Sequence, residues 1–278
     1  MENNSIEIDN IKKFSKNLRK KILLMAYSAG SSAAHIGGAL SIAEIVSVLY
    51  GAVMNFDKNL EQINSRDRFI LSKGHACLAL YAALNLKGLI TDEELLTFEK
   101  KNSPLLGHPV INQEKGIEFS TGSLGMGLSI GIGTAIGFKK KKETKRKVYV
   151  IIGDGESNEG SIWESAMAAP NFSLDNLVVI LDKNNFQQTG SNNEIMKNEL
   201  LKSKWENFGW NCYEIDGHKF DTLLSTLRLN ENNGKPKFII ANTVKGKGIH
   251  FTENDNKWHH SILTKSKYEE AIKQLNDE

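Results

Sequence analysis

Residues 147–185 read KVYVIIGDGESNEGSIWESAMAAPNFSLDNLVVILDKNN, and this stretch decides the expected fold. Two apolar runs, 147–154 and 176–183, flank a segment of helical character at 160–169. Each run is continuously apolar instead of alternating, which is typical of a strand covered on both faces. A strand, a helix and a second strand in succession indicate a parallel sheet. The sequence therefore predicts an α/β fold with a doubly wound, mostly parallel sheet flanked by helices.

The same alternation continues on both sides of this stretch. Thr91 followed by Glu94 is a capping-box pattern, which predicts a helix at 92–100. Further helices are expected at 6–29, 41–53, 76–87, 124–138, 196–207 and 219–229, further strands at 69–72, 211–215 and 237–242, a polar loop between 54 and 68, and irregular structure at 101–121. No linker or repeat interrupts the pattern, so residues 1–278 are expected to form a single domain.

Composition excludes several classes of function. The 278 residues carry a net charge of +2 with 40% hydrophobic content, so the chain offers no strong field to nucleic acid or to a membrane. The basic runs 139–142 and 145–147 are interpreted as a solvated connection. Cys77 and Cys212 are far apart and indicate reduced, buried thiols, and the polar N-terminus has no signal-peptide core. We therefore expect a cytoplasmic protein.

Polar residues follow the two apolar strands of the opening stretch. Gly153-Asp154-Gly155 ends the first strand. Asn184, which 28 residues separate from Gly155, directly follows the second strand. The carboxyl ends of parallel strands meet at one edge of the sheet, where ligands bind. The glycines allow backbone amides to approach an anion, and carboxylate and amide oxygens suit Mg²⁺ or Ca²⁺. The pattern predicts a divalent cation bridged to a diphosphate.

Other phosphate-binding patterns fit less well. Gly122, Gly125 and Gly127 reverse the spacing of the dinucleotide fingerprint, and no strand clearly precedes them. The chain also has no GK[ST] phosphate loop. A GDG triplet alone is common in turns, but GDG followed by 25 to 30 residues and Asn matches the thiamine-diphosphate motif.

The chain resembles the transketolase family over nearly its whole length. The segments that carry the resemblance, in the family's order, are AHIGGALSIAEI (34–45), RDRFILSKGHA (66–76), LLGHP (105–109), FSTGSLGMGLSIGIG (119–133), the GDG-to-NN stretch (153–190), DGH (216–218), TVKGKG (243–248) and ENDNKWHH (253–260). The resemblance implies the thiamine-diphosphate-binding fold, specifically its diphosphate-binding domain.

The resemblance also implies roles for single residues. The metal, Mg²⁺ or else Ca²⁺ or Mn²⁺, is expected to bind Asp154, Asn184 and the carbonyl of Phe186. Contacts to thiamine diphosphate are expected from His75, Gly122, Ser123, Leu124, Gly153, Asp154, Gly155, Glu159, Asn184, Phe186, Lys245 and His259. Glu159 and Glu164 are expected to satisfy loop amides or to reach an interface. His35, His75, His108 and His259 match catalytic histidines that hold hydroxyls and move protons, which suits imidazole near neutral pH. His218 is expected to be structural, and the role of His250 stays open.

Three positions depart from the family pattern, and so does the length of the chain. Ala34 and His260 stand where the family usually has Gly, and Met126 stands where Gln is common. Compared with the three domains of a transketolase, the chain corresponds to the first, so we expect the pyrimidine-binding and C-terminal domains to be absent from it. We expect a separately encoded partner subunit that supplies them with the catalytic Glu, in an α2β2 assembly acting on phosphosugars.

Function is therefore expected to be ketol transfer by the N-terminal subunit of a two-component transketolase, from a ketose phosphate to an aldose. One alternative is another thiamine-diphosphate enzyme, either a 2-oxo-acid dehydrogenase α subunit or a protein like deoxyxylulose-phosphate synthase. The HIGG, KGH and GHP series speaks against the dehydrogenase. A non-catalytic binding relic of the fold is the other alternative.

Overall fold

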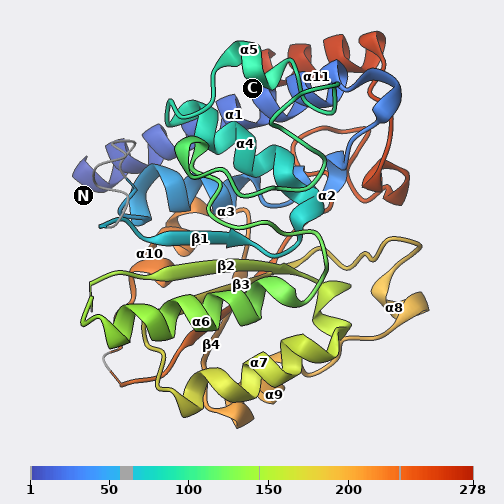
Figure 1. Cartoon of the computed structure of the whole chain (residues 1–278). Helices are drawn as coiled ribbons and strands as arrows, with labels where there is room; N and C mark the ends of the chain where they lie inside the picture. The colour runs from blue at the N-terminus through green and yellow to red at the C-terminus, as the bar shows by residue number, and fades with distance from the viewer. Residues whose placement is uncertain (1, 57–64, 144, 232, 278) are drawn as a thin grey trace.

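A computed structural model describes residues 2–56, 65–143, 145–231 and 233–277 (Figure 1). Most of the polar loop expected between 54 and 68 lies outside the described residues. The helices of ten or more residues are α1 Glu2–Ser28, α4 Cys77–Leu86, α6 Met126–Lys140, α7 Gly160–Asn171 and α11 Lys265–Asp277. The shorter helices are α2 Ile36–Leu40, α3 Ala43–Val48, α5 Asp92–Leu95, α8 Asn192–Ile195, α9 Leu201–Phe208 and α10 Phe220–Arg228. The remaining turns are η1 Gly30–Ser32, the π-helical η2 Leu49–Val53, η4 Gly74–Ala76, η5 Gln113–Lys115, η6 Glu156–Asn158 and η7 Asn256–His259.

Five parallel strands form one sheet in the order β1-β2-β3-β5-β4. They are β1 Arg68–Leu71, β2 Val148–Gly153, β3 Leu177–Lys183, β4 Asn211–Asp216 and β5 Lys237–Asn242. Every residue of β2 is buried, as the continuous apolar run predicts. The expected doubly wound, parallel α/β fold is confirmed.

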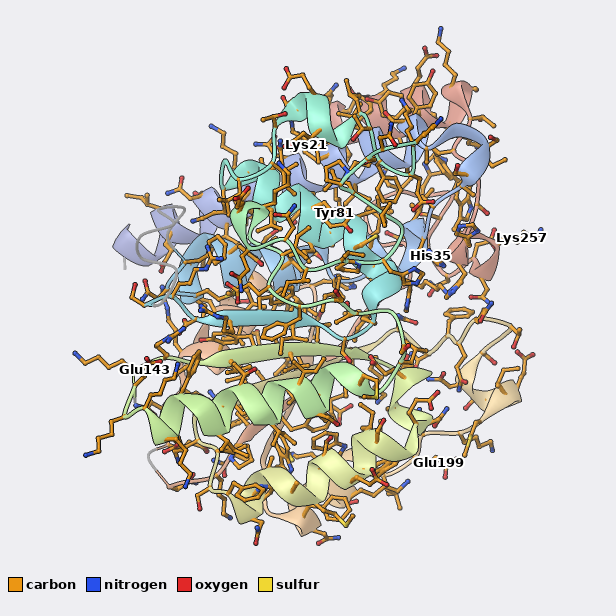
Figure 2. The ribbon with its side chains drawn as sticks, viewed as in Figure 1. Lys21, His35, Tyr81, Glu143, Glu199 and Lys257 are labelled. Carbon is orange, nitrogen blue, oxygen red and sulfur yellow. The ribbon has the colours of Figure 1, made fainter. Side chains whose placement is uncertain are left out.

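Helices cover both faces of the sheet (Figure 1). On one face, α1, α3, α4 and α10 pack on alternate strand residues such as Tyr149, Ile151 and Ile180. On the other face, α6, α7 and α9 pack on the residues between them, such as Val150 and Val179. Two cores on opposite faces of one sheet leave the carboxyl-terminal edge of the strands open. Figure 2 shows His35 toward that edge and Glu143 at the opposite end.

Two predicted helices are shorter in the structure than expected. The capping box of Thr91 and Glu94 forms in both directions, but α5 ends at Leu95, and Glu99 and Asn102 have positive φ angles that no α-helix accepts. The helix expected at 196–207 begins only at Leu201 because Leu200 adopts the left-handed conformation. The segment expected as a helix at 41–53 is α3 followed by a π-helical turn. The helix α11 was not predicted from the sequence.

Two smaller expectations, on Arg146 and on Cys212, are corrected. Arg146, expected in a solvated connection, is buried with its guanidinium 3.8 Å from the centre of the Phe138 ring. Cys77 is a buried free thiol, whereas Cys212 is only partly buried. Among the described helices, none has the length and apolar character to cross a bilayer.

Candidate active site

The loops that follow β2 and β3 meet at Asp154. Its Oδ2 accepts a hydrogen bond from the backbone amide of Asn185 at 2.6 Å. Its Oδ1 is buried without a hydrogen bond of normal geometry within the described chain, although the nearby Asn192 amide acts to stabilise the charged form. Burial, reinforced by the neighbouring charge of Asp182, raises the pKa of Asp154 to about 7. A carboxylate in this position is destabilised until a cation reaches its free oxygen.

Asn184 is oriented by hydrogen bonds on both sides of its amide. Its Nδ2 donates to Asp182 Oδ2 at 2.8 Å, and its Oδ1 accepts from the backbone amide of Phe186 at 3.1 Å. Because a carbonyl oxygen has two lone pairs, Oδ1 keeps the capacity to bind a cation. The two hydrogen bonds hold the side-chain amide of Asn184 in a single orientation.

Asp182 and Lys73 form a buried ion pair beneath this edge. Lys73 Nζ lies 2.5 Å from Asp182 Oδ2 and also donates to the carbonyl of Gly38. Burial acts to raise the pKa of Asp182, but the ammonium of Lys73 and the hydroxyls of Thr243 and Ser41 hold it below its usual value. The pair joins three segments, since Lys73 follows β1, Asp182 lies in β3 and Ser41 follows α2.

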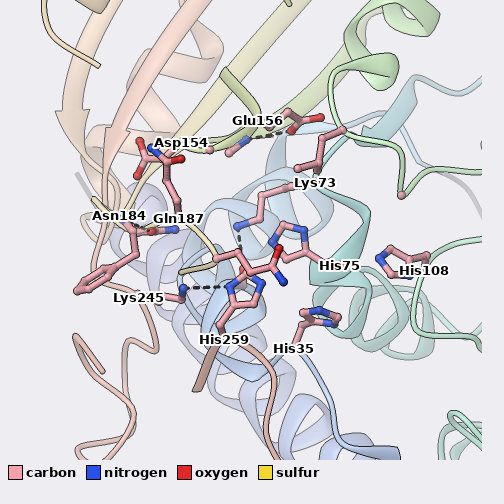
Figure 3. Close-up of a pocket in the computed structure, with 17 residues that line it drawn as sticks. His35, Lys73, His75, His108, Asp154, Glu156, Asn184, Gln187, Lys245 and His259 are labelled. Atoms are coloured by element: carbon pink, nitrogen blue, oxygen red, sulfur yellow. Dashed lines mark hydrogen bonds between the residues drawn. The ribbon is translucent and has the colours of Figure 1, made fainter. Parts of the chain in front are cut away.

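A cavity of about 220 Å³ opens at this edge of the sheet (Figure 3). Its lining brings together most of the residues predicted from the sequence. They are His35, His75, His108, Gly122, Leu124, Gly153, Asp154, Gly155, Asn184, Phe186, Lys245 and His259. Gly122 has φ +147°, and a β-carbon there would approach the His108 ring to 3.1 Å, so a side chain is excluded at this wall.

Ser123 and Glu159 are exposed and lie outside the cavity lining, so their predicted cofactor contacts stay predictions. The buried carboxylate that satisfies loop amides is Glu156, which the sequence reasoning missed. It accepts hydrogen bonds from the amides of Gly125 at 2.8 Å and Gly153 at 3.1 Å, and from the Ser72 hydroxyl. Glu164 is also exposed.

Four further lining residues were missed by the sequence reasoning: Gly38, Lys73, Gln187 and Gln188. Lys73 lies two residues before His75 in the segment 66–76, directly after the strand expected at 69–72. That position at a strand end could have identified Lys73 as a site residue. Gln187 and Gln188 follow the Asn184 loop but belong to no pattern that separates them from ordinary loop residues.

Lys245 brings a second ammonium group to the cavity. Its Nζ donates to the amide oxygen of Asn256 and lies 3.1 Å from Nδ1 of His259. Burial, with the charge of Lys73 nearby, lowers the pKa of Lys245 to about 8. Both of its partners are neutral, so its charge remains available to an anion in the cavity.

The loop that carries Lys245 is fixed from behind by His218. The backbone amide of Val244 donates to His218 Nε2 at 2.8 Å, which leaves Nδ1 to donate to Glu44 Oε2 at 3.0 Å. Arg19 pairs with the other oxygen of Glu44 and donates to the carbonyl of Lys247. His218 is therefore structural, as predicted, and its structural role is to hold the cavity loop. His250 instead contacts Glu270 and Gln274 on α11.

Four histidines from four segments converge at the other end of the cavity (Figure 3). The ring centre of His35 lies 5.4 Å from that of His75, 5.8 Å from His108 and 5.3 Å from His259. Burial and neighbouring histidines lower the pKa of His35 to about 3, and burial with Lys245 lowers that of His259 to about 4. Burial and Lys73 hold the pKa of His75 well below its usual value. At neutral pH these three imidazoles are neutral, so each can donate one hydrogen bond and accept another.

The cavity thus has a cationic end and an imidazole end, which meet where Lys245 contacts His259. The buried free oxygen of Asp154 fits a divalent cation, and the ammonium of Lys245 fits a diphosphate. No cluster of three or more His, Cys, Asp or Glu side chains suited to a metal occurs in the described part of the chain. The predicted ligand set contains a single carboxylate, so it does not depend on such a cluster.

Comparison with known proteins agrees with this arrangement. A family model described as "Transketolase, thiamine diphosphate binding domain" matches residues 15–277. The chain belongs to this family. It is 40% identical over 273 residues to one subunit of an apulose-4-phosphate transketolase from Phocaeicola vulgatus, a match that covers 98% of this chain and 96% of that protein. It is 41% identical over 245 residues to a 6-deoxy-6-sulfo-D-fructose transketolase subunit from a Clostridium species, covering 88% and 89%.

Solved structures give the same result for the fold. Transketolase from Leishmania mexicana superposes with a TM-score of 0.89 at 26% identity, covering 96% of this chain and 41% of that one. The chain thus matches subunit relatives over nearly their full length and full-length transketolases over less than half. The prediction of a split transketolase subunit that binds thiamine diphosphate is confirmed.

Proposed function

We propose that this chain is the diphosphate-binding subunit of a two-component transketolase that transfers a two-carbon ketol unit from an anionic ketose to an aldose. One observation carries the proposal: Asp154 and Asn184, at the ends of neighbouring strands, share a cavity with two lysines and four histidines. The first pair suits a cation, Lys245 suits a diphosphate, and the imidazoles suit sugar hydroxyls.

Binding of Mg²⁺ and of the cofactor's diphosphate is assigned to the cationic end of the cavity. Asp154 Oδ1, Asn184 Oδ1 and the Phe186 carbonyl would hold Mg²⁺, and Lys245, whose partners are neutral, would neutralise the diphosphate. Mg²⁺ is favoured because it takes few protein oxygens and fills its remaining positions with phosphate oxygens. When bound, thiamine diphosphate supplies the nucleophilic carbon that carries the two-carbon unit between sugars.

The histidines are assigned to proton and hydroxyl handling. Neutral imidazoles at His35 and His75 can each donate to a sugar oxygen and accept from a hydroxyl. Lys245 donates to Nδ1 of His259, which leaves Nε2 of that ring carrying the proton toward the cavity. His108 adds a fourth ring, brought in by the loop 105–109.

The partner subunit is proposed to cover the open side of the cavity. Leu124, which lines the cavity, is 37% exposed, and Met126 at the start of α6 is 51% exposed. An apolar rim at the mouth of a polar site suits burial against another protein. We propose an α2β2 assembly, because a second domain is needed to complete the site. We also propose a cytoplasmic location, which the free thiols Cys77 and Cys212 support.

Reconstitution tests the proposal directly. This chain mixed with the separately encoded pyrimidine-binding component, thiamine diphosphate and Mg²⁺ should transfer ketol from xylulose 5-phosphate to an aldose, and neither component by itself should do so. Activity of the isolated chain would exclude the two-component proposal. Turnover of pyruvate in place of xylulose phosphate would favour another thiamine-diphosphate enzyme.

The donor is proposed to be a ketose with a terminal anionic group. Two relatives are named for apulose 4-phosphate and for 6-deoxy-6-sulfo-D-fructose, which differ in the anion but share its presence. A specialised sugar pathway is therefore favoured over central pentose metabolism. A donor panel of phosphorylated, sulfonated and neutral ketoses tests this, since equal rates for all three would exclude an anion requirement.

A further inference from the structure

A backbone bridge places one more histidine against the cluster. Ala34 and Ser261 form an antiparallel pair in which each amide donates to the other carbonyl at 3.1 Å. The residues beside such a pair face one another, here His35 and His260. Their ring centres are 4.4 Å apart, closer than His35 lies to His75, His108 or His259. The position of His260 is therefore set by the backbone.

His260 lines a second cavity, of about 350 Å³, that shares two walls with the first. His35 and His108 line both cavities, whereas His260 and Glu99 line only the second. The residues of the cationic end, Asp154, Asn184 and Lys245, line only the first. The second cavity thus lies beyond the imidazole cluster, on the side away from the proposed diphosphate site.

The polar side chains of the second cavity suit neutral hydrogen-bonding groups, within a lining otherwise made by Ala33, Ala34, Phe98, Leu106, Gly107 and Val110. Its titratable side chains are three histidines and Glu99, and no Lys or Arg occurs among the described residues that line it. Glu99 accepts the backbone amide of Gly107 and so fixes the loop that carries His108. A carboxylate in a lining that holds no Lys or Arg side chain disfavours a phosphate group but accepts hydroxyls readily.

We propose that this second cavity binds the hydroxyl-bearing carbons of a sugar substrate beyond its reacting end, and that His260 is the residue that selects sugars long enough to reach it. The inference rests on the proposed transketolase function. A sugar whose carbonyl reacts beside His35 has its later hydroxyls directed past that ring toward His260. A two-carbon aldehyde has no such carbons, so it cannot use the contact.

The test compares unphosphorylated aldoses of increasing length in the reconstituted two-component enzyme. Glycolaldehyde, D-erythrose and D-ribose serve as acceptors with one donor, for wild type, His260→Gly and His260→Asn. The selectivity is kcat/KM for ribose divided by kcat/KM for glycolaldehyde. Each sugar is compared with itself across variants, so its open-chain fraction cancels. Lys257→Ala, an exposed side chain three residues away, is the matched control (Figure 2).

The expected result is a selectivity about tenfold lower in His260→Gly, the loss of one or two hydroxyl contacts, with erythrose intermediate. His260→Asn retains a donor and an acceptor, so its selectivity should lie between those of His260→Gly and wild type. The selectivity of Lys257→Ala should match that of wild type within about twofold. An unchanged selectivity in His260→Gly, or a higher one as removal of an obstruction would give, overturns the inference.

Two outcomes separate this inference from the function it rests on. Wild type that turns over glycolaldehyde, combined with the same selectivity in all variants, refutes only the role of His260. Wild type that transfers ketol to no acceptor refutes the proposed function, and the role of His260 falls with it. If His260→Gly proves inactive or unfolded, His260→Ala, which also removes both ring nitrogens, decides by the same ratio, with wild-type selectivity counting against the inference.

Discussion

Asp154 accepts the backbone amide of Asn185 through Oδ2 at 2.6 Å, while its Oδ1 is left buried without a normal hydrogen bond from the described residues. One oxygen therefore ties the loop after β2 to the loop after β3, and the other is left for a ligand. The same contact sets Asn184 beside Asp154 at the cavity wall.

Asp154→Asn should abolish the metal-dependent part of cofactor binding. The amide removes the negative charge but keeps the size of the side chain, so the fold should persist. We expect affinity for thiamine diphosphate in saturating Mg²⁺ to fall roughly 100-fold. Calorimetric titration of the two-component complex measures this, with Glu269→Gln, an exposed carboxylate on α11, as control. Wild-type affinity in Asp154→Asn would exclude Asp154 as a ligand.

Affinity for Mg²⁺ should depend on pH through Asp154. The pKa of this carboxyl is raised to about 7 in the metal-free protein, and only the ionised form binds a cation. Lowering the pH from 8 to 6 should therefore weaken Mg²⁺ binding about tenfold, as the ionised fraction falls from about 0.9 to 0.1. Mg²⁺ titrations at both values measure the change.

The same shift predicts the sign of a stability effect. Because the pKa of Asp154 is higher folded than unfolded, the metal-free protein binds more protons at this group than the unfolded chain between about pH 4 and 7. Its contribution to stability is then lost as the pH rises through 7, and Mg²⁺ restores it. The increase in Tm caused by Mg²⁺ should grow from pH 6 to pH 8. A constant increase would contradict the assignment.

Lys73→Met should destabilise the fold more than any surface substitution. It leaves Asp182 charged and buried, although the hydroxyls of Ser41 and Thr243 still donate to it. Breaking a buried pair on one side costs about 3–5 kcal/mol. Urea unfolding measures the loss, and Lys73→Met with Asp182→Leu should recover part of it. A cost below about 1 kcal/mol would show that the pair is not buried in solution.

His218→Ala should weaken cofactor binding without touching the cavity. It removes the acceptor for the Val244 amide and frees the loop that positions Lys245. We expect affinity for thiamine diphosphate to fall about tenfold, equivalent to about 1.4 kcal/mol. His218→Asn, which can still accept from that amide, should be affected less. His250→Ala is the control, because His250 contacts α11 instead of the cavity loop. Equal losses in the alanine variants would indicate a general effect on stability.

Met126→Glu should weaken assembly with the partner subunit. A charge placed on the exposed apolar rim has to be desolvated when the complex forms, and we expect roughly a tenfold loss of affinity. Sedimentation of the mixed subunits measures it. Leu229→Glu, at a similarly exposed position after α10, should leave assembly unchanged. Intact assembly of Met126→Glu would move the interface elsewhere.

The sequence alone determined the sheet and the corner where Asp154 and Asn184 meet. Continuous apolar runs report burial on both faces, and β2, β3 and β5 were each located within a residue or so of their bounds. Asp154 and Asn184 were found because strand ends in a parallel sheet share an edge, so spacing along the chain fixes proximity. The four histidines and Lys245 came from ordered resemblance, and they line the cavity.

Only the tertiary structure decided how the charges inside that edge are balanced. Glu156, instead of Glu159, satisfies the loop amides because a 3₁₀ turn at Glu156–Asn158 points it inward. Lys73 meets Asp182 across 109 positions, and His218 reaches the Lys245 loop through a backbone amide. The pairing of His35 with His260 depends on a two-residue bridge. Contacts between distant segments depend on packing geometry, which leaves no periodic trace in the chain.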